Sequence, residues 1–193
     1  MTDIEATVRS LRTEPPHGLE TRTMIGAGAA DHVATVDSPF GPVWVSWSIR
    51  GVTGLTPRFA CETIDNFLAS HHRNAYPADT LPRDLEDRII DALNEGATRN
   101  VPIDLRGLAT FQHAVLETCA MIEPGTVRSY GWIAERLENP GSVRAVGTAL
   151  GRNPIPLIIP CHRVVRSDGT IGNYAFGPEM KRQLLIREGA ILT

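Results

Sequence analysis

The alternation of hydrophobic and polar residues predicts a small antiparallel sheet in the first half of the chain. Residues 43–48 read Val-Trp-Val-Ser-Trp-Ser, which has the two-residue period of a strand that buries one face. Residues 32–37 form a second such run, and the turn-forming residues 38–42 between the two runs predict a hairpin. A weaker run at residues 52–59 predicts a third strand.

Helical patterns precede and follow this predicted sheet. We expect a short helix over residues 4–11, a tether rich in Pro and Gly after it, and helices over residues 60–72 and 82–95. His71 and His72 would end the first of these two helices on a solvated surface. The pattern divides the chain into an N-terminal extension (1–30), an α/β domain (31–100), an extended connector (101–108) and a C-terminal domain (109–193).

The second half of the chain has the period of helices. Apolar residues at positions 111, 115, 119 and 122 share one helical face, which assigns Cys119 to the core, and Pro-Gly at 124–125 ends that helix. Shorter helices are predicted over residues 130–137 and 142–151, with Ser142 as the N-cap of the second. Two helices joined by a tight turn containing glycine indicate a helix-turn-helix, although ordinary helical hairpins share this pattern.

The helix over residues 142–151 is unusual on the side away from its apolar stripe. The stripe consists of Val143, Val146 and Leu150, and the opposite side carries small residues and two arginines. Glycine inside a helix costs about 1 kcal/mol relative to alanine, so Gly147 and Gly151 need an explanation. Two explanations remain open: close packing of another helix, or close approach of a ligand backbone such as DNA.

Composition indicates a globular protein with reduced cysteines. The 193 residues are 42% hydrophobic, enough for a buried core, and no apolar run is long enough to predict a membrane span. Residues 1–12 lack the apolar segment of a secretory signal. Cys61, Cys119 and Cys161 are an odd number of cysteines without the spacing of metal ligands. We therefore expect a cytoplasmic protein with no metal site.

Charge is distributed unevenly between the two halves. The formal net charge is −3, but residues 109–193 carry nine basic residues against seven acidic ones. The basic residues are Arg128, Arg136, Arg144, Arg152, Arg163, Arg166, Lys181, Arg182 and Arg187. An electropositive half on an acidic protein permits binding to phosphates without requiring it.

Cys161 is the main candidate for chemistry. It follows a buried apolar run at residues 157–159 and a proline that fixes the backbone, and we expect a strand to deliver it next to His162. A thiol reacts as its thiolate, which a nearby base or cation favours, and His162, Arg163 and Lys181 are available for that purpose. A Cys-His pair alone is more often an inert cysteine buried in a strand.

A wider set of motifs resembles one protein family. The residues that carry the resemblance are Asn153-Pro154, Pro160-Cys161-His162-Arg163-Val164, Gly172-Asn173-Tyr174, Arg128-Ser129-Tyr130-Gly131, Arg144-Ala145-Val146-Gly147 and Glu188-Gly189. In order and spacing they resemble the O6-alkylguanine-DNA alkyltransferases, also called methylated-DNA–protein-cysteine methyltransferases. The resemblance runs from about Val101 to Gly189. The turn at residues 38–42 resembles the family's N-terminal domain, residues 50–100 match it poorly, and residues 1–30 have no recognised counterpart.

The resemblance implies irreversible repair of DNA without a cofactor. Cys161 would attack the alkyl carbon on O6 of guanine in an in-line displacement and keep the group. His162, acting through a water and Glu188, would draw off the thiol proton, and Asn153 would brace the loop. Tyr130 would stabilise the departing guanine and rotate the 3′ phosphate.

The resemblance also implies that the partner is double-stranded DNA containing O6-alkylguanine. The helix after the turn would enter the minor groove, and the alkylated base would be flipped out of the stack because its substituent is inaccessible within the duplex. Arg144 would fill the space left by that base. The residues implied at the DNA are Arg144, Ala145, Gly147, Thr148, Gly151, Arg152, Arg128 and Ser129. Those implied around the base are Tyr174, Val164, Pro156, Ala175, Phe176 and Lys181.

The chain departs from the family pattern beside the pocket tyrosine. Small residues, often serine and glycine, usually follow this tyrosine, whereas Ala175 and Phe176 follow it here. If the donor at this position is a main-chain N–H, Ala175 preserves it. Phe176 would narrow the pocket or stack on the alkyl group, unless it points away from Cys161 and caps the last helix. Lys181, the only lysine, is expected either near the thiol or in solvent. Zinc ligands found in the N-terminal domain of some relatives are absent.

The expected fold class is α+β. It comprises a small antiparallel-sheet domain with helices, followed by a helical domain of winged helix-turn-helix type that carries the reactive cysteine. We expect a monomeric methyltransferase that acts once per chain, with cooperative binding to DNA left open. One alternative is an alkyltransferase-like lesion binder or regulator without transfer chemistry, which the presence of Cys161 disfavours. Another is a cysteine hydrolase, which would need an oxyanion hole and a histidine distant in sequence.

Overall fold

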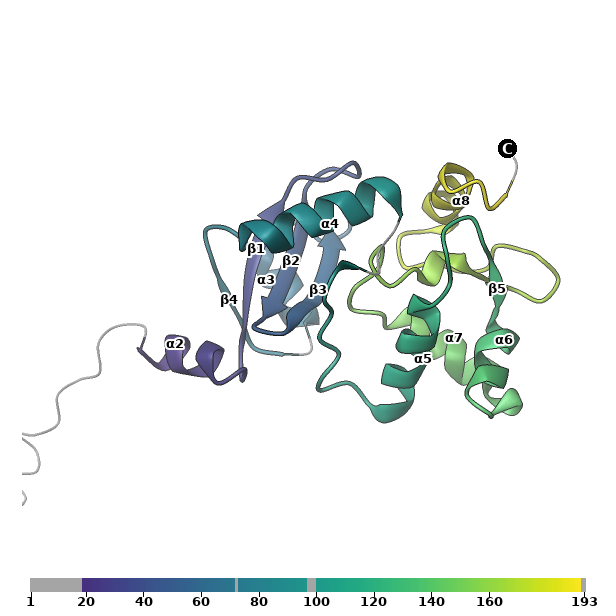
Figure 1. The fold of residues 1–193 in the computed structure, drawn as a ribbon, viewed down its shortest axis with the longest axis horizontal. Helices are drawn as coiled ribbons and strands as arrows, with labels where there is room; N and C mark the ends of the chain where they lie inside the picture. The colour runs from purple at the N-terminus through teal and green to yellow at the C-terminus, as the bar shows by residue number, and fades with distance from the viewer. Residues whose placement is uncertain (1–18, 72, 97–99, 192–193) are drawn as a thin grey trace, which may run out of the picture.

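The protein consists of two parts that lie side by side (Figure 1). The computed structural model describes residues 19–71, 73–96 and 100–191, so the helix predicted over residues 4–11 lies outside the described residues. A sheet with helices makes up the N-terminal part, and helices with a two-stranded sheet make up the C-terminal part. No helix within the described ranges is long and apolar enough to cross a membrane. The predicted α+β fold class is confirmed.

The N-terminal part contains a four-stranded sheet in the order β3-β2-β1-β4. Strands β1, β2 and β3 pair antiparallel, and β4 pairs parallel to β1. The predicted hairpin is present, with Val36 opposite Val43. The bounds are β1 (Asp31–Val36), β2 (Val43–Ser48), β3 (Gly51–Pro57) and β4 (Ala75–Pro77). The third strand thus ends earlier than predicted, and β4 is an additional strand.

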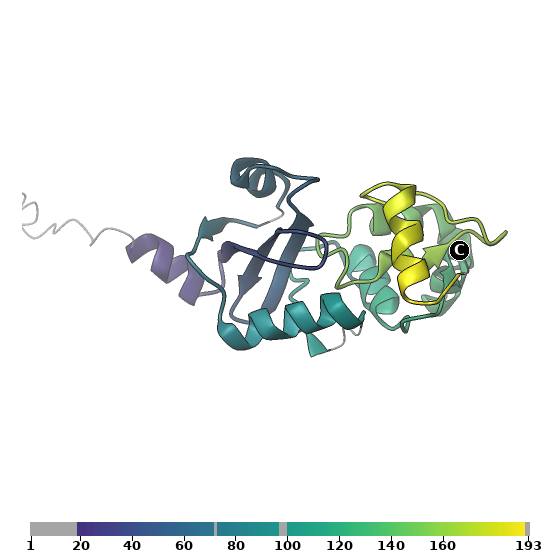
Figure 2. The ribbon, with the colours of Figure 1, turned by 90° about the horizontal axis from the view of Figure 1, so that it is seen from above.

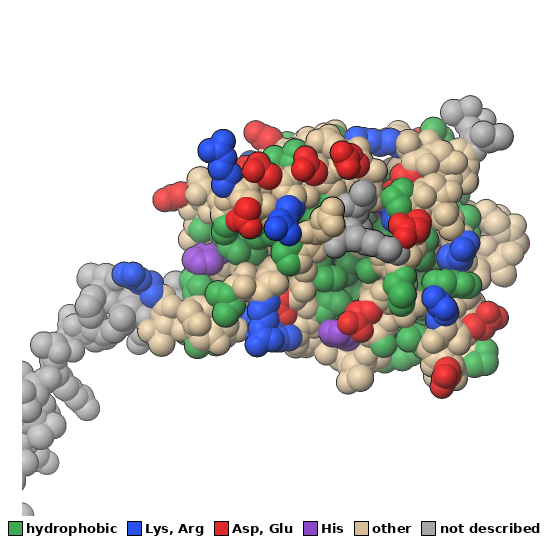
Figure 3. Space-filling model, in the orientation of Figure 1, with side chains coloured by type: hydrophobic (Ala, Val, Ile, Leu, Met, Phe, Trp, Pro, Cys, Tyr) green, Lys and Arg blue, Asp and Glu red, His purple; other side chains and the backbone are tan. Residues whose placement is uncertain are grey.

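Helices cover both faces of this sheet. Figure 2 shows α3 (Ile64–Ser70) and α4 (Arg83–Glu95) on opposite sides of it. Leu85, Ile89, Ala92 and Leu93 form the buried side of α4. Figure 3 shows acidic side chains along the outer side of α4, where Asp84, Asp87, Asp91 and Glu95 are exposed. This acidic side of the molecule is unfavourable for DNA phosphates.

Three sequence predictions for this part are wrong. A helix, α2 (Leu19–Gly26), lies where a tether was expected. Helix α3 begins at Ile64 rather than residue 60 because the Thr63 hydroxyl accepts a hydrogen bond from the Asn66 amide and caps it there. His71 is not solvated: its side chain is 2% exposed, and its Nε2 lies 3.0 Å from Oδ2 of the buried Asp31.

The C-terminal part contains the predicted helix-turn-helix. Helices α6 and α7 form it, and both pack against α5. The two-residue strands β5 and β6 pair parallel to each other. The bounds are α5 (Thr110–Ala120), β5 (Arg128–Ser129), α6 (Tyr130–Arg136), the 3₁₀ turn η2 (Pro140–Ser142), α7 (Val143–Gly151), the 3₁₀ turn η3 (Cys161–Arg163), β6 (Val164–Val165) and α8 (Pro178–Arg187).

Three local predictions for this part are also wrong. Ser142 precedes α7, but its hydroxyl donates to the Asn139 carbonyl and accepts no helix amide, because η2 already turns the chain there. Val143 is 40% exposed and lies outside the apolar stripe, which is completed by Ala149. Residues 157–159 form a buried turn rather than a strand, with Leu157 at a φ of 75°.

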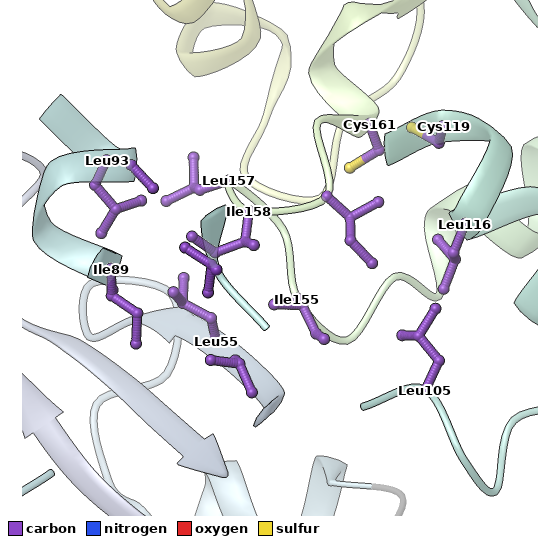
Figure 4. Close-up of a cluster of buried hydrophobic side chains, with 14 of the residues drawn as sticks. Leu55, Ile89, Leu93, Leu105, Leu116, Cys119, Ile155, Leu157, Ile158 and Cys161 are labelled. Carbon is purple, nitrogen blue, oxygen red and sulfur yellow. The ribbon is translucent and has the colours of Figure 1, made fainter. Parts of the chain in front are cut away.

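One hydrophobic cluster joins the two parts. Figure 4 shows Leu55, Ile89 and Leu93 of the N-terminal part facing the segment that carries Ile155, Leu157 and Ile158. The Leu55 amide also donates to the Pro154 carbonyl at 2.9 Å. The N-terminal part therefore supports the segment that leads to Cys161.

Candidate active site and nucleic-acid interface

Cys161 lies at the start of the turn η3 and is 7% exposed. The side-chain amide of Asn153 donates to the Ile159 carbonyl at 3.0 Å and lies 3.3 Å from the Cys161 sulfur. Its oxygen accepts from the Ile155 amide at 3.0 Å. Asn153 therefore closes the segment into a loop and contacts the thiol directly.

Burial leaves the Cys161 thiol neutral at rest. Burial raises the pKa of Cys161, and the hydrogen bond from Asn153 and the charge of Lys181 oppose this effect. Burial also lowers the pKa of Lys181 to about 8. The Lys181 ammonium donates to the Val164 carbonyl at 2.6 Å and the Asn173 carbonyl at 3.3 Å. Lys181 is therefore buried and does not lie in solvent, which was one of its two expected positions.

His162 and Glu188 form a buried pair beside the thiol. Nε2 of His162 lies 2.9 Å from a Glu188 oxygen, while Nδ1 is buried and has no hydrogen-bond partner among the described residues. Burial lowers the pKa of His162, although Glu188 raises it. The pKa of Glu188 falls to about 2 because hydrogen bonds from His162 and Arg163 outweigh burial. His162 is thus a neutral imidazole with one nitrogen available to accept a proton.

Arg163 connects this pair to both parts of the protein. Its guanidinium donates to both oxygens of Glu188 at 2.8–2.9 Å, to the Ile122 carbonyl at 2.5 Å and to the Gly96 carbonyl at 2.7 Å. Sequence reasoning considered Arg163 only as a cation for the thiol. Its partners lie far from it along the chain, so no local pattern signalled this role.

A pocket of about 230 Å³ opens beside Cys161. It is lined by Tyr130, Gly147, Leu150, Gly151, Cys161, Asn173, Tyr174 and Ala175. Among the six residues expected around the base, Tyr174 and Ala175 line this pocket, and Val164, Pro156, Phe176 and Lys181 do not. The Phe176 ring packs instead edge-on between Phe59 and Tyr174.

The outer side of α7 is accessible and carries the expected residues. Arg144, Ala145, Thr148, Gly151 and Arg152 are exposed, and Gly147 is half-buried. A Cβ at Gly151 would meet nothing within 4 Å, and one at Gly147 would make an ordinary contact of 3.8 Å with the Tyr130 ring. Packing within the described chain therefore requires glycine at neither position, which favours approach of a ligand.

Ser129 and Arg128 precede α6 and have partners within the protein. The Ser129 hydroxyl accepts a hydrogen bond from the Trp132 amide at 3.0 Å and caps α6. The Arg128 guanidinium lies 5.5 Å from the centre of the Trp132 ring, and the Arg136 guanidinium lies 5.0 Å from it. Arg128 remains exposed on the same end of the helix-turn-helix as Tyr130.

The fold and the site define a class of protein. A helix-turn-helix with an accessible second helix lies against a pocket whose lining includes a cysteine, and a histidine–carboxylate pair adjoins that cysteine. Residues 110–190 match the family model described as the 6-O-methylguanine DNA methyltransferase DNA-binding domain.

Comparison with whole proteins shows the family. The chain is 34% identical to the methylated-DNA–protein-cysteine methyltransferase of Salmonella typhimurium, over 81% of this chain and 95% of that protein. It is 36% identical to the Mycobacterium tuberculosis protein of the same name, over 80% and 90% of the two chains. The chain belongs to the methylated-DNA–protein-cysteine methyltransferase family.

A solved structure supports the same relationship in three dimensions. The chain superposes on Mycobacterium tuberculosis OGT in complex with DNA with a TM-score of 0.66 and 34% identity, over 82% of this chain and 93% of that one. The resemblance noted in the sequence is therefore confirmed.

Proposed function

We propose that this protein repairs O6-alkylguanine in double-stranded DNA by moving the alkyl group onto Cys161. The observation that carries the proposal is the position of Cys161 in the lining of a 230 Å³ pocket beside α7. In the transfer, the bond between O6 and the alkyl carbon breaks and a bond from sulfur to that carbon forms. The electrons of the broken bond remain on the guanine.

Proton transfer in this reaction is assigned to His162 and Tyr130. His162 accepts the thiol proton at Nδ1 through a water and passes it to solvent, while Glu188 stabilises the imidazolium. Tyr130 gives its proton to the departing guanine and recovers one from solvent, so protons balance. The buried, unpartnered Nδ1 and the Nε2 contact to Glu188 support this division of roles.

DNA recognition is assigned to α7 in the minor groove. The exposed Arg144 fills the space left by the flipped base, and the small residues Ala145, Gly147 and Gly151 let the DNA backbone approach closely. Thr148, Arg152 and Arg128 lie at the phosphates. Ser129 contributes to DNA recognition indirectly, by capping the N-terminus of α6.

The reaction ends after one transfer. Removing the alkyl group from the thioether would expel the Cys161 thiolate, which is a poor leaving group. Among the described residues the pocket lining contains no second thiol or amine to accept the alkyl group. We assign the active form to a monomer, since one chain supplies both the helix-turn-helix and the cysteine. The location that we propose is the cytoplasm, in association with the nucleoid when the protein is bound to DNA.

Mass spectrometry after incubation with duplex DNA containing O6-methylguanine tests this function. We expect one added methyl group per chain, located on Cys161, and none in Cys161→Ala. A lesion-binding protein would retain the DNA without a mass change. A hydrolase would continue to convert substrate beyond one equivalent, which would overturn the proposal.

A further inference from the structure

A row of aromatic rings runs from the N-terminal part to the wall of the pocket. The Phe59 ring lies 5.9 Å from the Phe176 ring at 73°, and Phe176 lies 5.4 Å from Tyr174 at 87°. Tyr174 in turn meets His162 edge-on at 6.3 Å. Edge-to-face contacts of this kind are favourable beyond the area they bury. Phe59 follows β3, whereas Tyr174 and Phe176 precede α8.

The part of the pocket wall formed by Tyr174 lies in an irregular segment, which is held by a hydrogen bond from the Gly177 amide to the Tyr174 carbonyl and by the contact from Lys181 to the Asn173 carbonyl. Residues 166–177, between β6 and α8, contain no helix or strand. The Tyr174 hydroxyl is buried and has no hydrogen-bond partner among the described residues. Ring packing, rather than a hydrogen bond from this hydroxyl, therefore fixes where the Tyr174 side chain lies.

Phe59 contributes little to the hydrophobic core. It is 60% exposed, and it lies outside the cluster of buried residues that joins the two parts. Among the described residues, the ring contact that the structure shows for Phe59 is the one with Phe176.

We infer that Phe59 is a positioning residue that sets the width of the alkyl pocket. The N-terminal part holds Phe176 through Phe59, and Phe176 holds Tyr174 against the space next to Cys161. Phe59 acts through these two rings and not on the reacting atoms. The inference rests on the proposed function, because the pocket it shapes is the one assigned to the alkylated base.

Phe59→Ala tests the inference, with Ile49→Ala as the matched control. Ile49 is 70% exposed, lies in the turn between β2 and β3, and has no place in the row of rings. The quantities to measure are single-turnover rates on duplexes with O6-methylguanine and O6-benzylguanine, together with the melting temperature of each variant. An aromatic pair contributes about 0.5–1.5 kcal/mol, which corresponds to an about two- to tenfold change in rate.

The expected result is a change in selectivity in a protein that stays folded. Phe59→Ala should raise the benzyl-to-methyl rate ratio about two- to tenfold, with a small fall in melting temperature from the lost ring contact. Ile49→Ala should leave the ratio unchanged, and Phe59→Tyr should restore it. Because Phe59 acts through Phe176, the double variant Phe59→Ala/Phe176→Ala should equal Phe176→Ala alone. Equal effects of Phe59→Ala on both substrates, or additive effects in the double variant, would overturn the inference.

A reagent assay separates this inference from the proposed function. Iodomethane and benzyl bromide are thiol alkylating reagents that need no DNA, and peptide mass spectrometry gives the ratio of the two adduct rates at Cys161 separately from those at Cys61. If the wild type transfers no methyl group from DNA, the proposed function fails, yet a changed reagent ratio in Phe59→Ala still supports the positioning role. An unchanged reagent ratio refutes that role whatever the outcome with DNA.

Discussion

At the scale of single residues, the pair of Cys161 and His162 predicts how the reaction depends on pH. Burial lowers the pKa of His162 below 6.5 and raises that of Cys161 above 9.0. Near neutral pH the imidazole is therefore a base and the thiol keeps its proton. The two groups have the protonation states that a proton transfer from sulfur to nitrogen requires.

We expect the transfer rate to fall only when the pH drops below 6.5, the ordinary pKa of histidine. The rate should decline there because protonated His162 accepts no further proton. Single-turnover rates from about pH 5 to about pH 9 test this expectation. The His162→Gln variant should be slower and lack the acidic decline, and a decline that persists in it would assign the titration to another group.

Residue identities in the site followed from sequence motifs, whereas their mutual contacts did not. Asn153, Cys161, His162 and Glu188 carry a recognisable spacing, so sequence alone named them. The contacts from Arg163 to Gly96 and from Phe59 to Phe176 join segments that are distant along the chain. Such contacts arise when the two parts pack against each other. The local sequence pattern around each residue contains no information about that packing.

At the scale of elements, long periodic segments were predictable and short ones were not. Strand β2 has the predicted bounds, although all its residues except the half-buried Trp44 are buried, and α4 is one residue shorter than predicted. Strand β4 has only three residues, and it is a strand because it pairs with β1, which its own sequence does not indicate. The apolar run before Cys161 was mistaken for a strand because a buried turn and a buried strand show the same continuous hydrophobic signal.

Helix α7 offers a prediction in which stability and binding change in opposite directions. Gly151→Ala adds a methyl group where no atom lies within 4 Å. It should stabilise the free protein by up to about 1 kcal/mol, since alanine favours helix, and weaken binding to duplex DNA. Urea unfolding and fluorescence anisotropy measure the two effects. Unchanged affinity in this variant would show that the DNA does not approach α7 closely at this point.

Arg144 on the same helix should matter only when a base has to leave the duplex. Arg144→Ala should slow repair of duplex DNA and spare the reaction of Cys161 with free O6-benzylguanine, because unstacking a base costs a few kcal/mol. The test is to measure the rates on duplex DNA and on free O6-benzylguanine in both the variant and the wild type. Equal losses on both substrates would indicate a structural role for Arg144.

At the scale of the whole molecule, the buried carboxylates predict sensitivity to acid. The pKa of Glu188 is about 2 in the folded protein against an ordinary 4.5. Its contribution to stability is therefore complete above 4.5 and is lost as the pH falls towards 2. The pKa of Asp31 is lowered as well. Burial raises it, but hydrogen bonds from His71 and Arg73 lower it by more.

Glu188→Gln should accordingly unfold at a lower urea concentration at neutral pH and show a flatter dependence on pH between 4.5 and 2. Free energies of unfolding at several pH values give both quantities. Glu179→Gln, an exposed change on α8, is the control and should follow the wild type. A Glu188→Gln curve parallel to the wild type would mean that other groups cause the acid sensitivity.

The bond from the Leu55 amide to the Pro154 carbonyl limits how this protein can be recombined with its relatives. A chimera that kept residues 110–190 and took its sheet from a distant protein would retain the helix-turn-helix and Cys161. It would lose the edge of β3 and the side chains of α4 on which Ile155, Leu157 and Ile158 rest. The two parts therefore have to be transferred together into a chimera, although the family model matches residues 110–190 alone.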